Sequence, residues 1–135
     1  MKAETYLSQI RRLEKMIEVR NREIETLRAR ANSISPKLSE DKVQTSFDND
    51  KMGTIVAEIV DAEDELASLK RKKGLIIAQI EGMEDLNEYY VLTDRYIMGM
   101  TFECIADDID KSARYCLKIH KRALENFEKK YLKAQ

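Results

Sequence analysis

Residues 101–127 read TFECIADDIDKSARYCLKIHKRALENF, and this stretch decides the C-terminal fold. Thr101 and Ser112 favour helix N-caps, and each stands directly before a segment with apolar residues at helical spacing. Asp110 and Lys111 separate the two segments, which predicts a tight turn between a short and a longer helix. The pattern is typical of a helix-turn-helix. Its predicted inward residues are Phe102, Ile105, Ala106, Ile109, Cys116, Ile119, Ala123 and Phe127.

Charge is distributed unevenly over the same stretch. Residues 103–110 carry four acidic side chains and no basic one, whereas residues 111–122 carry six basic groups, counting His120, and no acid. The whole chain has a formal charge of −1, so composition hides this separation. In a helix-turn-helix the first turns of the second helix enter the DNA major groove, so an outward basic face predicts DNA binding. A solvated helix surface is the simpler alternative.

The five Lys and Arg residues of 111–122 have different expected roles. Arg114 and Lys118 are one turn apart, so both can reach base edges, and arginine to guanine is the commonest specific contact. Lys111, Lys121 and Arg122 are better placed for phosphates, where charge fixes position rather than sequence.

The preceding residues complete a three-helix domain. The segment EDLNEYYVLTDRYIM (84–98) is predicted to be a helix that ends at Gly99, a residue suited to positive φ. Tyr115, on the last helix, is expected to pack inside. The core candidates from the first helix are Leu86, Tyr89, Val91, Leu92 and Tyr96.

The segment YYVLTDRYIMGMTFECIADDIDKSARYCLKIHKRALENF (89–127) resembles the promoter-reading fourth region of bacterial sigma factors. It is still more similar to small phage and prophage regulators of the ArpU and RinA type. The shared frame includes Arg95-Tyr96, Gly99, Ile105-Ala106, Ser112 and the RAL of residues 122–124.

In sigma factors, the residues that touch DNA lie early in the last helix, which implies Ala113, Arg114, Leu117, Lys118 and Lys121 here. Ala113 and Leu117 depart from the charged pattern of sigma factors, so the resemblance does not imply the same promoter specificity. The full predicted DNA-binding set is Lys111, Ser112, Ala113, Arg114, Leu117, Lys118, Lys121 and Arg122.

Residues 1–82 carry two series of apolar residues at heptad spacing, separated by a Ser- and Asp-rich segment over 33–49 that contains Pro36. They predict a long antiparallel helical hairpin with a flexible connection at 33–49 and a domain boundary near Gly82. Arg20 interrupts the first series and is expected near Glu63 and Asp64. Because two stripes leave one flank uncovered, we expect a homodimer or higher homo-oligomer. The predicted arm core is Ile10, Leu13, Ile17, Ile24, Leu27, Ile55, Ile59, Leu66, Leu69 and Ile76.

Other classes of function find little support in the sequence. No apolar run approaches the roughly 20 residues needed to cross a bilayer, and no signal peptide is recognisable, so a cytoplasmic protein is expected. There is one His and no phosphate-cradling glycine loop, which argues against an enzyme and against a cofactor. Cys104, Cys116 and His120 could offer three zinc ligands, but without a fourth we expect no metal and assign both cysteines to the core.

The sequence therefore predicts an all-α protein, a long coiled-coil hairpin followed by a helix-turn-helix domain. The predicted function is sequence-specific binding of double-stranded DNA to regulate transcription, with a phage or prophage origin and a bacterial host implied by the resemblance. The arm would dimerise the protein or contact host RNA polymerase. The alternative is a protein-interaction adaptor whose arm binds polymerase or another regulator and whose helix-turn-helix does not touch DNA. Neutral total charge, Ala113 and Leu117 favour that alternative.

Overall fold

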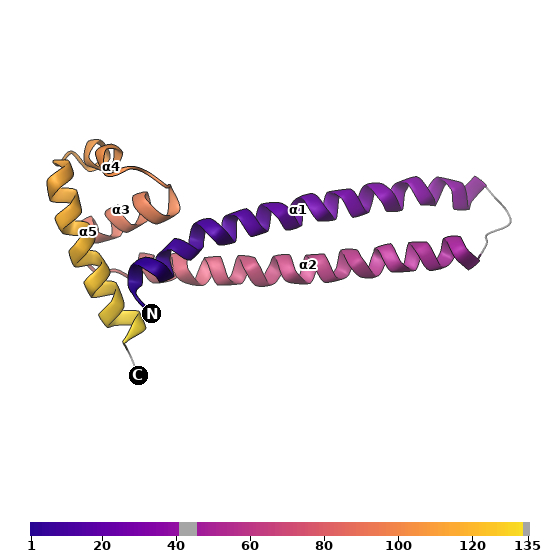
Figure 1. Cartoon of the computed structure of the whole chain (residues 1–135), viewed down its shortest axis with the longest axis horizontal. Helices are drawn as coiled ribbons and strands as arrows, with labels where there is room; N and C mark the ends of the chain where they lie inside the picture. Colours follow the sequence, from indigo (N-terminus) through magenta and orange to yellow (C-terminus); the bar gives the residue numbers. More distant parts are fainter. Residues whose placement is uncertain (41–45, 134–135) are drawn as a thin grey trace. The chain divides into compact units, whose positions relative to one another are not determined.

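The computed structural model describes the backbone of residues 1–40 and 46–133, and side chains over 1–34 and 49–133. Within these residues the protein is all-α and has no strand, as the sequence predicts (Figure 1). No helix among them is both long and apolar enough to cross a lipid bilayer. The elements are α1 (Ala3–Glu40), α2 (Ser46–Glu81), α3 (Leu86–Leu92), the π-helical turn η1 (Thr93–Ile97), α4 (Phe102–Ile109), α5 (Ala113–Phe127) and the π-helical turn η2 (Glu128–Leu132).

The chain forms two compact units. The arm unit is Lys15–Arg71, which comprises the later part of α1 and the earlier part of α2. The C-terminal unit is Met1–Glu14 together with the chain from Lys72 onward. The predicted boundary near Gly82 does not coincide with this division, which falls inside both long helices. Helix α2 does end there, at Glu81, so Gly82 marks the end of a helix rather than the edge of a unit.

Packing explains why the start of α1 belongs to the C-terminal unit. The ring of Phe127, which is fully buried, lies 5.8 Å from the ring of Tyr6 and 4.9 Å from that of Tyr131. The Tyr6 hydroxyl donates a hydrogen bond of 2.6 Å to Gln79 Oε1 on α2. Each buried large apolar side chain contributes about 1.5–3 kcal/mol relative to exposure. The fully buried side chains of this unit also include Leu7, Ile10 and Ile80.

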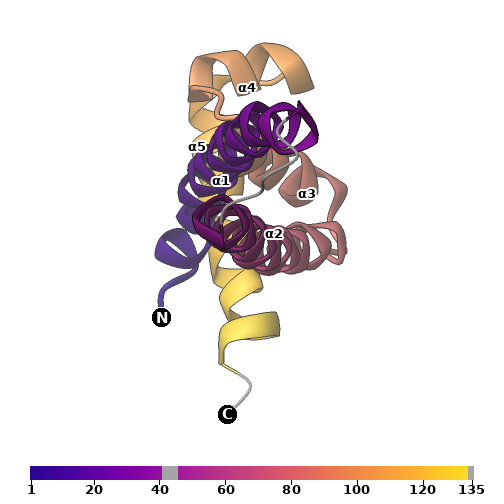
Figure 2. The same ribbon diagram turned by 90° about the vertical axis from the view of Figure 1, so that its right-hand side faces the viewer.

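In the arm unit, α1 and α2 run side by side (Figures 1 and 2). Arg20 pairs with Glu65, and Arg28 Nη2 lies 3.3 Å from Glu63 Oε2. From Arg20 to Arg28 the residue number rises along α1, whereas the number of the paired acid falls from Glu65 to Glu63 along α2, so the two segments are antiparallel. The prediction that Arg20 meets Glu63 and Asp64 is wrong. Arg20 is half-buried at the edge of the apolar seam, and from there its side chain reaches the exposed Glu65 instead.

The heptad residues take the buried positions that their spacing predicts. Every described apolar residue of the two series is buried or half-buried. Two helices cover each other from one side only, so some seam residues keep partial contact with solvent. Of the predicted arm core, the buried residues are Ile10, Leu13, Ile24, Leu27, Ile55, Leu69 and Ile76, and the half-buried residues are Ile17, Ile59 and Leu66.

The connection between the long helices is shorter than predicted. Helix α1 continues past Pro36 to Glu40, and α2 already begins at Ser46, so both ends of the predicted 33–49 segment are helical. Residues 41–45, on which the rest of this prediction falls, lie outside the described residues. Adding a residue to an existing helix costs far less than starting one, so loss of apolar periodicity did not end α1 where the sequence suggested.

Helix α3 is rotated relative to the prediction. Val91, Leu92 and Tyr96 are buried as expected, but Tyr89 is half-buried and Leu86 is 63% exposed. The inward position near the start of α3 belongs instead to Glu88, which is only 3% exposed. An acid can take such a position only where partners satisfy its charge, and helix α5 supplies them, as described below.

Candidate nucleic-acid interface

The turn before α5 is built as the sequence predicts. The Thr101 side chain accepts a hydrogen bond from the Cys104 amide and caps α4, while the Ser112 side chain accepts one of 3.1 Å from the Tyr115 amide and caps α5. Between them Asp110 adopts a left-handed conformation with φ of 58°, the one such non-glycine among the described residues. The amides of Asp110 and Lys111 both donate to the carbonyl of Ala106, which closes the end of α4.

The inner face of α5 is held by a tight apolar core. Cys116, Ile119, Ala123 and Phe127 are all at most 2% exposed, as their spacing predicts. The first two pack with Val91, Ile105 and Ala106 from α3 and α4. Figures 1 and 2 both place α4 against the start of α5. This packing fixes which side of α5 faces solvent.

The outer face of α5 presents three cations. Arg114, Lys118 and Lys121 are exposed, and in the part of the chain that the structure describes none lies within 4.0 Å of a carboxylate oxygen. Leu117 lies among them and is 50% exposed. Lys111 is also exposed, with its Nζ 5.7 Å from the ring centre of Tyr115.

Not all of the predicted contact residues are free to contact DNA. The Ser112 hydroxyl is engaged in capping, and Ala113 is half-buried against the core. Tyr115 is 40% exposed, so the prediction that it packs inside is wrong. Its position on the flank of α5 leaves the ring against Lys111 rather than in the core.

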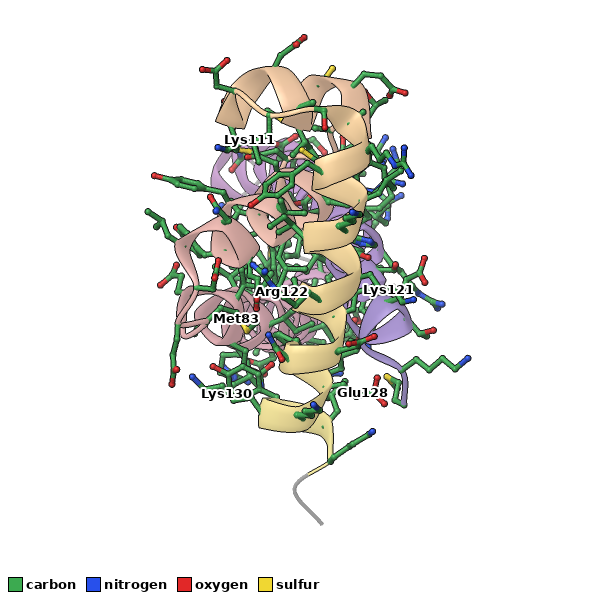
Figure 3. All side chains as sticks on the ribbon, turned by 90° about the vertical axis from the view of Figure 1, so that its left-hand side faces the viewer. Met83, Lys111, Lys121, Arg122, Glu128 and Lys130 are labelled. Carbon is green, nitrogen blue, oxygen red and sulfur yellow. The ribbon has the colours of Figure 1, made fainter. Side chains whose placement is uncertain are left out.

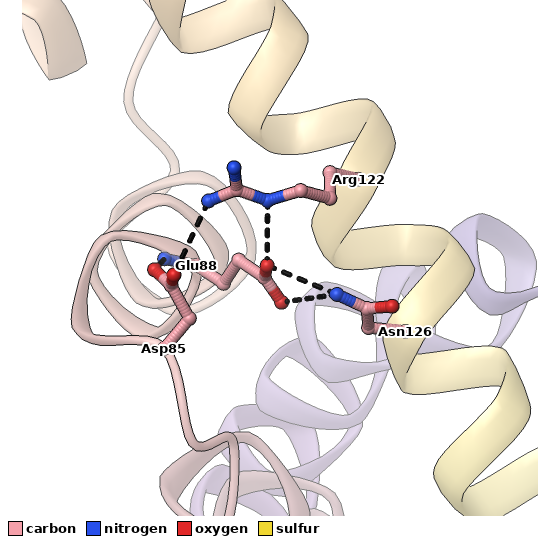
Figure 4. Close-up of polar contacts among 4 residues, drawn as sticks. All are labelled: Asp85, Glu88, Arg122 and Asn126. Atoms are coloured by element: carbon pink, nitrogen blue, oxygen red, sulfur yellow. Dashed lines mark hydrogen bonds and ion pairs between the residues drawn. The ribbon is translucent and has the colours of Figure 1, made fainter.

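Arg122 lies on the edge of α5 that faces α3, whereas Lys121 lies on the edge that faces α1 (Figure 3). Arg122 Nε lies 2.8 Å from Glu88 Oε2, and Nη2 lies 3.3 Å from Asp85 Oδ2 (Figure 4). Asn126 Nδ2 donates at 3.0 Å to both Glu88 oxygens. The hydrogen bond to Glu88 raises the pKa of Arg122. The structure therefore places Arg122, a predicted phosphate contact, in an internal ion pair.

His120 is not a surface cation either. Its Nε2 lies 2.7 Å from the Tyr96 hydroxyl, and the two rings stack at 5.7 Å. Burial lowers the pKa of His120 below its usual 6.5, so the imidazole is neutral at pH 7. Burial, followed by the charge of Glu4, raises the pKa of Tyr96 to about 12.

Two features of this unit escape sequence reasoning. A cavity beside His120 brings together Arg11 from α1 and Arg95 from η1, which lie 84 positions apart in the sequence. Asp94, 6% exposed, faces Asp108 of α4, and its Oδ2 has no hydrogen-bond partner among the described residues. Burial, followed by the nearby Asp108, raises the pKa of Asp94 to about 7. No sequence signal identifies either feature, because both depend on contacts across the fold.

The zinc alternative gains no geometric support. Cys116 is buried, but Cys104 is exposed rather than in the core, because Ile105 and Ala106 form the packed face of α4. Within residues 1–40 and 46–133 there is no group of three or more His, Cys, Asp or Glu side chains arranged to hold a metal ion.

Comparison with known proteins identifies no relative of this chain. No protein-family model matches it, and neither the curated proteins nor the solved structures include a significant match.

Proposed function

We propose that this protein binds double-stranded DNA through α5 and regulates transcription. The observation that supports this most directly is the row of Arg114, Lys118 and Lys121. They stand exposed on a capped helix that follows a tight turn, and no described acid neutralises them. This is the arrangement in which a recognition helix offers cations to the major groove.

The roles we propose follow from position on the helix. Arg114 and Lys118 lie in the first two turns and would read base edges, each good contact being worth about 1–3 kcal/mol of discrimination. Lys111 and Lys121 would contact phosphates. Leu117, between them, would lie against an apolar base edge such as the thymine methyl group. Arg122 is omitted because it is already paired with Glu88.

The remaining parts of the proposal come from the sequence. Two copies would associate through the flank of the arm that the two apolar stripes leave uncovered, and would place their recognition helices on half-sites about one helical turn apart. The resemblance to phage and prophage regulators suggests a protein that acts in the bacterial cytoplasm, with host RNA polymerase as a further partner of the arm.

The test is fluorescence polarisation with labelled duplex DNA, first a randomised pool to select a site and then the selected site in a salt series. Affinity should fall steeply with salt, each neutralised phosphate adding about 0.9 to the logarithmic slope. Arg114→Ala and Lys118→Ala should each weaken binding to the selected site about tenfold or more. Lys70→Ala, the same loss of charge on an exposed residue of the arm unit, is the matched control. If both α5 variants bind the selected site like the wild type, the proposed role of α5 is wrong.

A second candidate function is an adaptor that binds a protein through the same face. Leu117 and Tyr115, 50% and 40% exposed, are large apolar groups that a protein partner would cover. Leu117→Ala then distinguishes the two. The adaptor would be favoured if the wild type forms a salt-insensitive protein complex and has no DNA affinity, and if Leu117→Ala loses that complex.

A further inference from the structure

The C-terminal unit contains a cavity that the proposed DNA contacts do not use. Its volume is about 360 Å³, and side chains from α1, η1, α4 and α5 line it together with Gly99. A liquid water molecule occupies about 30 Å³, so the cavity is large enough for a tetrahedral oxyanion with part of its hydration shell. Two arginines, Arg11 and Arg95, are among its lining residues.

Arg95 is held in a fixed orientation. Its Nη1 donates a hydrogen bond of 2.9 Å to the Met100 carbonyl, and its guanidinium carbon lies 4.6 Å from the ring centre of Phe102. The guanidinium carries five N–H donors, so further donors remain for a ligand after this contact. A guanidinium that is already ordered loses less entropy when it binds an anion.

Gly99 makes the place for Arg11. Gly99 has φ of 72°, and a Cβ built on it would overlap the Arg11 guanidinium. The absence of a side chain at residue 99 therefore allows Arg11 to lie directly against the backbone beside η1. In this way Arg11 and Arg95 reach one cavity from opposite ends of the sequence.

The charges around the cavity do not cancel. Glu4 is the one acidic residue among its lining residues, and His120, which also lines it, is neutral at pH 7 because burial lowers its pKa. Over the described part of the chain, neither Arg11 nor Arg95 lies within 4.0 Å of a carboxylate oxygen, Glu4 included. Two guanidinium groups against one carboxylate leave one net positive charge in a partly enclosed space, where an anion is attracted more strongly than in bulk water.

We propose that this cavity binds a phosphate-type oxyanion, held by the guanidinium groups of Arg11 and Arg95. The planar fork of arginine matches the geometry of phosphate oxygens, and such bonds are stronger than those between neutral groups. Lys121 follows His120 in sequence and lies on the edge of α5 that faces α1 (Figure 3), so the site adjoins the basic face of α5. The oxyanion is either a phosphodiester of the DNA backbone or a free phosphate group. The proposal does not require that the chain binds DNA.

The experiment is a titration of full-length ¹⁵N-labelled protein with sodium phosphate at constant ionic strength, with chloride as the balancing anion. Chemical shifts of the Gly99 and Met100 amides report on the cavity, and we expect saturation with a Kd of roughly 1–10 mM, as for a single small ion. Arg11→Gln should weaken this binding about tenfold. Arg12→Gln, the same change on the exposed neighbour that does not line the cavity, should leave it unchanged.

A second variant keeps the test decisive if Arg11→Gln alters the fold. Glu4→Gln removes the one carboxylate of the cavity and should tighten phosphate binding several-fold, whereas a purely structural carboxylate would give no such gain. No shift of the two amides up to about 50 mM phosphate, or equal affinity in wild type, Arg11→Gln and Glu4→Gln, overturns the proposal. A selected DNA duplex then identifies the source. Displacement of phosphate by DNA assigns the site to the backbone, and retention in the DNA complex assigns it to a free oxyanion.

Discussion

Replacing Arg122 with alanine should destabilise the protein because of what it leaves behind. The Glu88 side chain is 4% exposed and would retain hydrogen bonds only from Asn126. The lost hydrogen bond of 2.8 Å is to a charged group, a class worth about 1.5–3 kcal/mol, and the exposed pair with Asp85 adds at most about 1 kcal/mol. Arg122 itself is half-exposed and half-hydrated, which favours the lower end of this range. We expect a loss of about 2 kcal/mol and a fall in Tm of about 6 °C.

Thermal and urea unfolding followed by circular dichroism measure this loss. Lys121→Ala, one residue away on the same helix, is the control and should cost less than about 0.5 kcal/mol. Combining Arg122→Ala with Glu88→Gln should cost less than the sum of the single changes, because the two groups interact directly. If Arg122→Ala, Lys121→Ala and the wild type all melt at the same temperature, the ion pair between Arg122 and Glu88 contributes no stability. Arg122 would then again be a candidate for phosphate contact.

Three further predictions concern pH, a glycine and the arm. Burial and the nearby Asp108 raise the pKa of Asp94 from 3.8 to about 7. The unfolded chain therefore releases this proton at a lower pH than the folded chain, so the free energy of unfolding falls as the pH rises from about 4 to 7. Asp94→Asn should remove this pH-dependent loss of stability, which is on the order of 2–4 kcal/mol. If urea unfolding at pH 5 and pH 8 shows the same difference in stability for the variant as for the wild type, the prediction is wrong. Gly99→Ala should cost about 1–2 kcal/mol because of its positive φ, whereas Gly74→Ala, inside α2 with open space around it, should be neutral or stabilising in the same melting assay. Arg20→Met should change stability by less than about 1 kcal/mol, because the ion pairs of Arg20 with Glu23 and Glu65 are partly exposed. A loss of more than about 1 kcal/mol in the variant, together with a wild-type stability that added salt does not lower, would refute this.

The parts of the fold that local chemistry decides were predictable from the sequence. Thr101 and Ser112 cap their helices because a hydroxyl two or three residues before free amides satisfies them whatever the tertiary context. Gly99 has the positive φ expected of it. The heptad rows, likewise, needed only apolar spacing, since any partner helix buries the same stripe.

The parts that depend on a distant partner were not predictable. The sequence shows Leu86 and Glu88 two residues apart, and hydrophobicity favours Leu86 for the core, yet Glu88 is buried because Arg122 and Asn126 lie opposite it. The register of the arm failed similarly. A heptad fixes which face of a helix is buried, but a shift of one or two residues along the axis changes the partner of Arg20 without exposing the seam.

The candidate site shows how far a count of charges can mislead. Residues 111–122 contain six basic groups, but His120 is buried and neutral and Arg122 is paired with Glu88 and Asp85. Three cations, Arg114, Lys118 and Lys121, therefore remain on the outer face of α5, and Lys111 lies beside its start. Further positive charge comes from Arg11 of α1 and Arg95 of η1, which line the same cavity as His120 of α5. Since the start of α1 belongs to the same compact unit as α5, the electrostatic surface of this unit is set by residues from both ends of the chain. A fragment that began at Gly82 would keep the helix-turn-helix sequence and lose Arg11 together with the Tyr6 contact that supports Phe127.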